Sequence, residues 1–142
     1  MILIISDYHK KEDVVLSLIE KYKPSYTLCL GDGESEKEFY TKNNIISVKG
    51  NCDYAELETV KVIDVGGIKI LMTHGHLHDV HFDIFKLYLL ATSLEVDYVM
   101  YGHTHNQSLE KYEGILFINP GALKDGYYAL LDDGSIILKK VE

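Results

Sequence analysis

The first nine residues, MILIISDYH (1–9), decide how the rest of the chain is interpreted, because an apolar, strand-like run ends in two metal-type ligands, Asp7 and His9. Four more segments repeat this arrangement of polar residues directly after an apolar run. They are Gly31-Asp32, Gly50-Asn51-Cys52-Asp53, Thr73-His74-Gly75-His76 and Gly102-His103-Thr104-His105. Sites in α/β sheets form at the carboxyl ends of strands. The five segments therefore predict one metal-centred site assembled from distant parts of the chain.

The first third of the chain predicts a parallel sheet. Apolar runs at 1–6, 26–30 and 45–48 are typical of buried strands, and helices are expected between them at 12–22 and 34–42. A strand–helix–strand–helix–strand order implies parallel pairing with right-handed crossovers.

The rest of the chain predicts mostly hairpins. Strands are expected at 59–65, 68–72, 97–101, 107–112, 115–118, 127–131 and 135–140, and a helix at about 82–93. The expected fold is a two-sheet α/β sandwich with helices on the outer faces. We expect one domain of residues 1–142, because no linker, repeat or low-complexity segment divides the chain.

The charge balance limits the possible partners. The net charge is -8, and all 14 basic residues are lysine. Polyanion binding depends on a basic surface, and arginine is the favoured clamp for phosphate. Long nucleic acids are therefore not expected as tightly bound partners, and the positive charge that a phosphate needs must come mainly from metal ions.

Two further features indicate the setting of the protein. The apolar N-terminus lacks a basic region and ends at Asp7, so it is interpreted as a strand and not as a signal peptide. No run is long enough to span a bilayer, so no membrane partner is expected. Two cysteines, Cys29 and Cys52, are too few for a disulfide framework, which predicts a reducing, cytoplasmic location. The oligomeric state stays open, and a homo-oligomer is one possibility.

The ligand types predict two divalent ions. Asp-x-His and His-x-His place both side chains on one side of extended backbone. The candidate ligands are Asp7, His9, Asp32, Asn51, His74, His103 and His105. Seven ligands are too many for one ion but suit two ions that share a carboxylate. The expected metal is Mn²⁺, with Ni²⁺, Fe²⁺, Co²⁺ or Zn²⁺ as alternatives.

The order of these motifs resembles the calcineurin-like metallophosphoesterase superfamily, from Asp7 to the turn at Asn119-Pro120-Gly121. The short length and the segments 50–53 and 73–76 are similar to the small YfcE-type phosphodiesterase branch. The resemblance implies that one metal is held by Asp7, His9, Asp32 and His105, and the other by Asp32, Asn51, His74 and His103, with Asp32 bridging. It also implies hydrolysis of small phosphodiesters by a hydroxide that bridges the metals.

Four residues are candidate catalytic residues: Asn51, which is also a candidate ligand, Cys52, Asp53 and His76. Most of the superfamily has a histidine where this chain has Cys52, and a thiol is a poor replacement for imidazole as an acid at neutral pH. This departure favours substrates with good leaving groups, although Cys52 could equally be an inert thiol. Asp53 is expected to orient a ligand, and His76 either contacts substrate or supports the ligands.

Other residues are expected to have structural or surface roles. His78 and His81 are predicted to face solvent at the start of the following helix, and Cys29 and Met72 are predicted to lie in the core. After Asn119-Pro120-Gly121 the YfcE-type branch often has a basic, proline-containing segment, but this chain has Ala122 to Gly126 instead.

Two classes of function stay open. The first is a phosphoester hydrolase, and the second is a protein-binding scaffold of the same fold, similar to the retromer subunit, with residual metal binding. The intact Gly-Asp and Gly-Asn-x-Asp motifs favour the hydrolase. A metal-dependent nuclease or nucleotidase is a third possibility, since the negative charge argues against long nucleic acid but not against small nucleotides.

Overall fold

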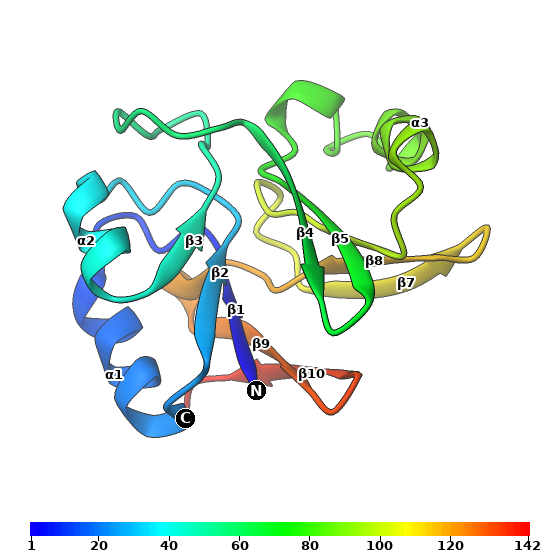
Figure 1. The fold of residues 1–142 in the computed structure, drawn as a ribbon. Coiled ribbons are helices and arrows are strands. Elements are labelled where there is room, and N and C mark those ends of the chain that lie inside the picture. Colours follow the sequence, from blue (N-terminus) through cyan, green and yellow to red (C-terminus); the bar gives the residue numbers. More distant parts are fainter.

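The apolar run Ile2–Ile5 forms β1, the central strand of a five-stranded sheet in the computed structural model, which describes residues 1–142 (Figure 1). The other strands of this first sheet are β2 (Tyr26–Cys29), β3 (Ile45–Ser47), β9 (Tyr127–Asp132) and β10 (Ser135–Lys140). The strand order is β10-β9-β1-β2-β3. The pairs β1–β2 and β2–β3 are parallel, as the sequence predicts, whereas β9 is antiparallel to both of its neighbours.

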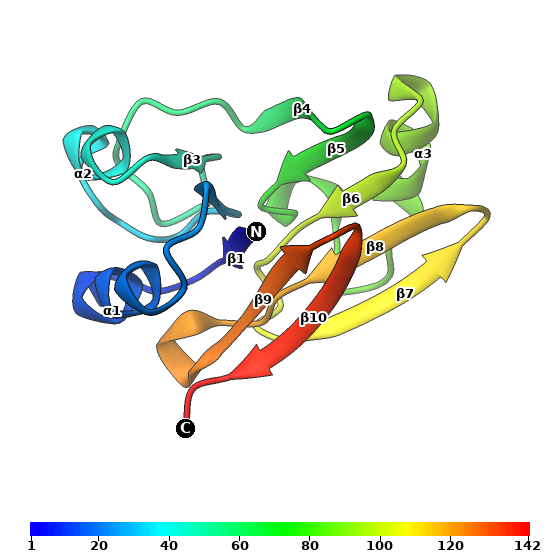
Figure 2. The ribbon, with the colours of Figure 1, turned by 60° about the horizontal axis from the view of Figure 1, so that its bottom comes forward.

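A second five-stranded sheet packs against the first. Its strands are β4 (Val60–Val65), β5 (Ile68–Thr73), β6 (Tyr98–Met100), β7 (Ser108–Tyr112) and β8 (Ile115–Asn119). The order β4-β5-β6-β8-β7 combines parallel pairing in the centre with an antiparallel hairpin at each edge. Figure 2 shows the β7–β8 and β9–β10 hairpins side by side. Gln107 links them, because its amide nitrogen donates to the carbonyls of Tyr128 and Lys139 at 3.1 and 2.9 Å.

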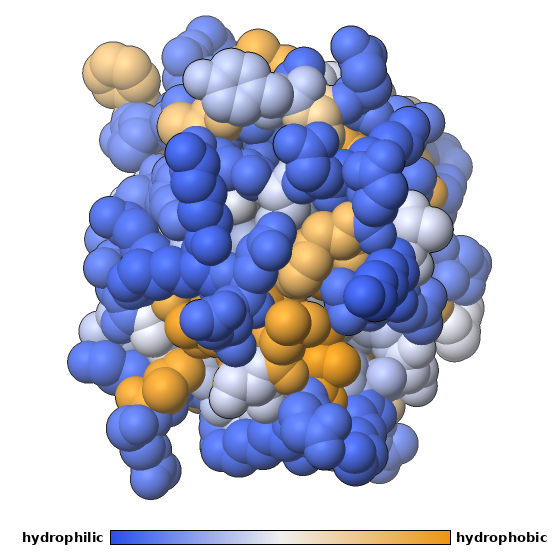
Figure 3. Space-filling view, turned by 90° about the vertical axis from the view of Figure 1, so that its left-hand side faces the viewer, coloured by the Kyte–Doolittle hydropathy of each residue, from blue (hydrophilic) through white to orange (hydrophobic).

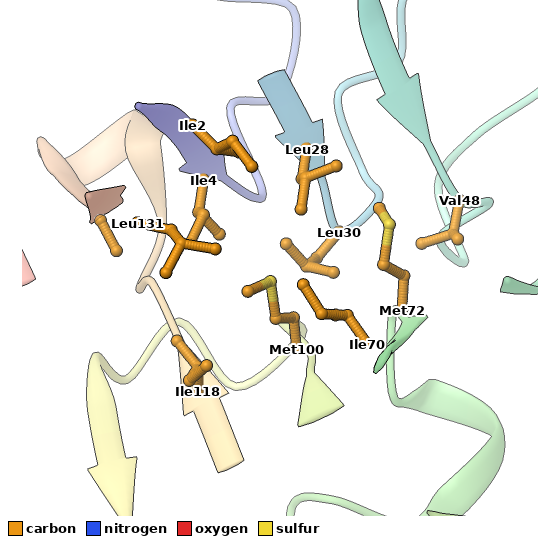
Figure 4. Close-up of a cluster of buried hydrophobic side chains, with 11 residues drawn as sticks. Ile2, Ile4, Leu28, Leu30, Val48, Ile70, Met72, Met100, Ile118 and Leu131 are labelled. Atoms are coloured by element: carbon orange, nitrogen blue, oxygen red, sulfur yellow. The ribbon is translucent and has the colours of Figure 1, made fainter. Parts of the chain in front are cut away.

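The main hydrophobic core lies between the two sheets. Ile4 and Leu28 from the first sheet meet Ile70, Met72 and Met100 from the second (Figure 4). The alternate residues of β1 face the other side of the first sheet, so the strand is buried on both faces. A continuous apolar run is what such a strand requires.

Helices cover the outer faces of the sandwich. α1 (Glu12–Tyr22) and α2 (Lys37–Lys42) lie over the first sheet, and α3 (Phe85–Leu94) lies over the second (Figure 1). Figure 3 views the side of α1 and α2, where hydrophilic side chains dominate and leave a limited hydrophobic area. None of the helices combines the length and the apolar character that a membrane span requires. The predicted two-sheet α/β sandwich with external helices is confirmed.

Helix boundaries differ from the prediction at two places. The helix expected at 34–42 begins only at Lys37, because Glu34 has a φ of 60° and turns toward the strand ends. The helix expected from 82 begins at Phe85, whose N–H is accepted by the side chain of Asp83 at 3.0 Å. Cys29 and Met72 are fully buried, which confirms their predicted place in the core.

Candidate metal centre

The backbone is strained at most of the predicted ligands. Five of the seven candidate ligands have φ values between 42° and 69°, a backbone region that residues other than glycine seldom adopt. They are Asp7, His9, Asp32, His103 and His105. Each such residue costs on the order of 1–3 kcal/mol, and strain of this kind concentrates at functional sites. The loops at the strand ends therefore hold these side chains in positions that folding alone does not favour.

Asp7 is the centre of the first group of ligands. Its Oδ1 lies 3.2 Å from Nε2 of His105, 3.7 Å from Nε2 of His9 and 3.8 Å from Nε2 of His74. Asp7 is fully buried, and Oδ1 has no hydrogen-bond partner. A buried carboxylate oxygen without a donor is costly, so this position fits a cation. Ligand atoms of Asp7, His9 and His105 all lie within 4.8 Å of one another.

A second group consists of Asp32, His74 and His103, whose ligand atoms also lie within 4.8 Å of one another. Nδ1 of His74 lies 2.7 Å from the carbonyl oxygen of Leu30 and donates to it. This contact leaves the Nε2 lone pair directed at Oδ2 of Asp32, 3.1 Å away. That nitrogen is buried and has no hydrogen-bond partner, as a metal-binding imidazole requires.

Asp32 also belongs to a third group, with His9 and Cys52. It is therefore placed between the Asp7 side and the His74 side of the site. This is the position that a carboxylate shared by two ions would occupy.

The electrostatics of the centre favour a bound cation. Burial opposes ionisation of Asp32, but the imidazole of His74, whose Nε2 lies 3.1 Å from Oδ2, outweighs it and lowers the pKa of Asp32 to about 2. Burial opposes the charged form of His74, but the carboxylates of Asp32 and Asp7 outweigh it and raise the pKa of this imidazole, so the centre attracts positive charge. Burial, reinforced by His74 and His81, lowers the pKa of His103, so its imidazole is neutral near pH 7. Neutral imidazole is the form that binds metals.

Asp53 braces the loops that carry the ligands. Its Oδ2 accepts the N–H groups of Asp32 and Gly50 at 2.9 and 2.7 Å, and its Oδ1 accepts that of Glu34 at 2.8 Å. Both carboxylate oxygens are thus engaged with backbone. This geometry agrees with an orienting role for Asp53.

Asn51, Cys52 and His76 lie at the rim of the centre. Asn51 is exposed, and its amide nitrogen lies 3.6 Å from Sγ of Cys52, so its role as a ligand stays a prediction. Burial and the negative charge of Asp32 raise the pKa of the Cys52 thiol, which is therefore protonated at neutral pH. The His76 ring lies 5.4 Å from that of His74, and its buried Nδ1 has no partner.

Three residues support the ligands, and two of them, Glu34 and Ser6, were not expected from the sequence. Glu34 accepts from Nδ1 of His9 at 3.0 Å and thereby directs Nε2 of His9 toward Asp7. The hydroxyl of Ser6 donates to Oδ2 of Asp7. Asn119, expected mainly as a turn residue, donates to the carbonyl of Gly102 at 3.2 Å and so fixes the loop of His103 and His105. Glu34 and Asn119 act through tertiary contacts, whereas Ser6 contacts the residue that follows it in the chain.

The prediction for His78 and His81 needs correction. His78 lies in a short 3₁₀ helix, His76–His78, and not at the start of α3. His81 is exposed as predicted, but its ring centroid lies 4.4 Å from that of His103. The side chain of His81 therefore forms part of the wall of the centre.

Two glycines permit the close approach of the loops. A Cβ at Gly50 would clash with Oδ1 of Asp32 and lie 2.6 Å from its backbone nitrogen. A Cβ at Gly102 would lie 2.7 Å from Oδ2 of Asp7. The motifs Gly-Asn-x-Asp and Gly-His-x-His thus need glycine because backbone packs directly against the ligand carboxylates.

An α/β sandwich whose strand ends bring two buried aspartates together with four histidines has the architecture of a metal-dependent phosphoesterase. Residues 1–133 match the model of the calcineurin-like phosphoesterase superfamily domain. The chain belongs to this superfamily, as the order of its motifs predicts.

Similar proteins agree with this assignment. The chain is 34% identical over 128 residues to a probable metallophosphoesterase, YsnB, of Bacillus subtilis, covering 87% of this chain and 75% of the relative. A crystal structure of a predicted phosphoesterase from Streptococcus pneumoniae is 33% identical, with a TM-score of 0.82 over 90% of this chain and 79% of that chain. A Vps29 variant from Entamoeba histolytica is 26% identical, with a TM-score of 0.76 over 99% and 97% of the two chains.

Proposed function

We propose that the protein is a metal-dependent phosphodiesterase that hydrolyses small phosphodiesters at a dinuclear metal centre. The observation that carries this proposal is the pair of ligand groups around Asp7 and around His74, joined by Asp32. The two fully buried and unpartnered atoms, Asp7 Oδ1 and His74 Nε2, support it because both face the same centre.

The residues present fit two divalent ions. Asp7, His9 and His105 would hold one ion, Asn51, His74 and His103 would hold the other, and Asp32 would be shared. Bound ions would supply positive charge for the phosphate and an activated water. The oxygen and nitrogen ligands suit Mn²⁺, which we propose as the metal, with Ni²⁺, Fe²⁺, Co²⁺ or Zn²⁺ as alternatives.

The chain itself contributes positioning and little positive charge. It has no arginine, and the nearby Lys11 is directed at the carbonyl of Lys124, 3.1 Å away. Neutralisation of the phosphate therefore falls to the ions. One phosphate can be neutralised in this way but not a tract of them, which supports small phosphoesters over long nucleic acids as substrates.

The surroundings of Cys52 support diesters with good leaving groups. In hydrolysis, a water oxygen bonds to phosphorus, the bond from phosphorus to the leaving oxygen breaks, and that oxygen takes up a proton. The raised pKa of Cys52 makes its thiol a weak proton donor at neutral pH. Alcohols that leave readily without protonation are therefore the better substrates.

A second candidate is a protein-binding scaffold of the same fold, which the likeness to Vps29 fits. The positive φ values at five predicted ligands argue for the enzyme, because a scaffold has no need to maintain that strain. We also propose a cytoplasmic location, which the two free cysteines, Cys29 and Cys52, support.

A metal-by-metal activity screen tests the proposed function. The protein is freed of metal with a chelator and assayed on bis(p-nitrophenyl) phosphate after addition of Mn²⁺, Ni²⁺, Co²⁺, Fe²⁺ or Zn²⁺. Activity should be absent after chelation and return with at least one ion. The Asp32→Ala variant should stay inactive with every ion, whereas Asp133→Ala, in the exposed β9–β10 turn, should behave like the unaltered protein. Undiminished hydrolysis after chelation would exclude the proposal.

A further inference from the structure

A cavity of about 400 Å³ lies beside the candidate metal centre. It is lined by the segment before α3, including His81 and Asp83, and by the segment from Tyr101 to Glu110 that leads into β7. Its volume lies within the roughly 300–1,000 Å³ typical of small-molecule sites. The proposed hydrolysis of a phosphate group assigns no role to this cavity.

The cavity and the metal centre share a wall. His81 lines the cavity, and its ring centroid lies 4.4 Å from that of the candidate ligand His103. Thr104, between the candidate ligands His103 and His105, lines the cavity as well. The side-chain amide of Asn119 donates to the Thr104 hydroxyl, with 2.9 Å between nitrogen and oxygen. This hydrogen bond fixes Thr104 in the wall between the cavity and the metal centre. A phosphodiester bound at the centre would therefore have one of its two alcohol arms next to this cavity.

The lining of the cavity is negatively charged. It contains two carboxylates, Asp83 and Glu110, and no lysine. The lysine–carboxylate ion pairs of the chain involve other residues, so neither charge is neutralised by a lysine. Tyr101 adds an aromatic ring, which attracts cations, and Ser108 adds a hydroxyl. Such a lining repels a second phosphate and favours a positively charged group.

We propose that this cavity binds one alcohol arm of the phosphodiester substrate and selects an arm that carries an amine or a quaternary ammonium. The proposal rests on the proposed function, since it assigns the substrate class of the same site. A diester with such an arm has no net charge, which also avoids repulsion by a chain of net charge -8. Nucleotides with additional phosphates would be excluded by the same carboxylates.

A matched pair of chromogenic diesters tests this selection. One is p-nitrophenyl phosphorylcholine, and the other is p-nitrophenyl 3,3-dimethylbutyl phosphate, in which carbon replaces the ammonium nitrogen. Because the two esters differ only at this atom, the ratio of their kcat/KM values measures the contribution of the positive charge to substrate selection. The unaltered protein should prefer the choline ester by about three- to tenfold, as expected for one or two partly exposed charge contacts.

Variants then locate the preference. Glu110→Gln and Asp83→Asn should each lower the ratio, and the double variant should bring it to about one. Glu113→Gln is the matched control, because it lies in the same β7–β8 hairpin but does not line the cavity. It should leave the ratio unchanged.

The outcomes separate the two proposals. Hydrolysis of both esters with a ratio near one in the unaltered protein would overturn the assignment of the cavity and leave the proposed function standing. A preference that survives in the double variant would do the same. Failure to hydrolyse either ester with any metal would overturn the proposed function, and the substrate assignment with it.

Discussion

The core between the sheets and the loops at the strand ends are neighbours in the chain but opposite in character. In β1, Ile4 lies in extended backbone and is fully buried among apolar side chains. Three residues later, Asp7 has a φ of 51° and a fully buried carboxylate with one unpartnered oxygen. The core therefore stabilises the fold, whereas the loops contain groups that are unfavourable until a cation binds.

The second sheet repeats this contrast. Met72 and Met100 are buried in the core between the sheets. His74 follows Met72 by two residues, and His103 follows Met100 by three. Substitutions in the core should therefore change folding, and substitutions at the strand ends should change metal binding and activity. Folding and metal binding should thus be separable by substitution.

The largest effect is expected for Asp7→Ala. The rate constant kcat/KM on an aryl phosphodiester should fall at least about a thousandfold, or about 4 kcal/mol of barrier, because Asp7 faces three candidate imidazole ligands. The metal-free protein should also lose some stability, because the Ser6 hydroxyl and the N–H of His103 lose their acceptor, Oδ2 of Asp7. Asp13→Ala, in the exposed first turn of α1, is the control and should keep full activity. A near-normal rate in Asp7→Ala would contradict the account.

Leu28→Ala should have the reverse effect. Loss of a fully buried side chain between the sheets should lower the free energy of unfolding by about 2–5 kcal/mol in urea denaturation. The number of ions bound per folded chain should not change. Leu16→Ala, in which 42% of the residue is exposed, should cost much less. Loss of metal in a folded Leu28→Ala protein would show that the two regions are not separable.

Metal removal should change stability through the loops alone. At a free Mn²⁺ concentration of about 100 times the dissociation constant, binding should add about 2.7 kcal/mol per ion to the free energy of unfolding. Asp32→Asn should lose most of this gain, because it removes the charge of the shared carboxylate. Equal denaturation midpoints with Mn²⁺ and with chelator in the unaltered protein would contradict a metal centre built from these loops.

The smallest effect is expected at Cys52. Cys52→Ser should keep activity on bis(p-nitrophenyl) phosphate within about threefold, less than 1 kcal/mol of barrier. Cys52→His should raise kcat/KM for p-nitrophenyl phosphate relative to the diester, because imidazole is a better proton donor near neutral pH. A thousandfold loss in Cys52→Ser at unchanged metal content would show that the thiol is essential.

The sequence predicts the core better than the loops. Helix α1 was placed correctly at 12–22 because its apolar residues repeat at helical spacing and Pro24 prevents extension. The predicted start of the helix expected at 34–42 was wrong, because hydrogen bonds to Asp53 and His9 hold Glu34 outside the helix. Such contacts join distant segments and leave no periodic signal in the sequence.

The site shows the same division between residues at strand ends and residues joined by local or tertiary contacts. Six predicted ligands converge because each follows a strand, and parallel strands end at the same edge of a sheet. Ser6 and Glu34 were missed because a single polar residue next to a ligand has no distinctive spacing. The cavity beside the centre could not be predicted, since it forms where the segment around His81 meets the segment around Glu110.

Crystals grown with Mn²⁺ and measured at the manganese absorption edge test the central claim most directly. The account predicts two anomalous peaks about 3.5–4 Å apart, with the carboxylate of Asp32 between them. Calorimetric titration of the same protein should give two ions per chain. A single peak, or two peaks of which only one contacts Asp32, would contradict a dinuclear centre bridged by this residue.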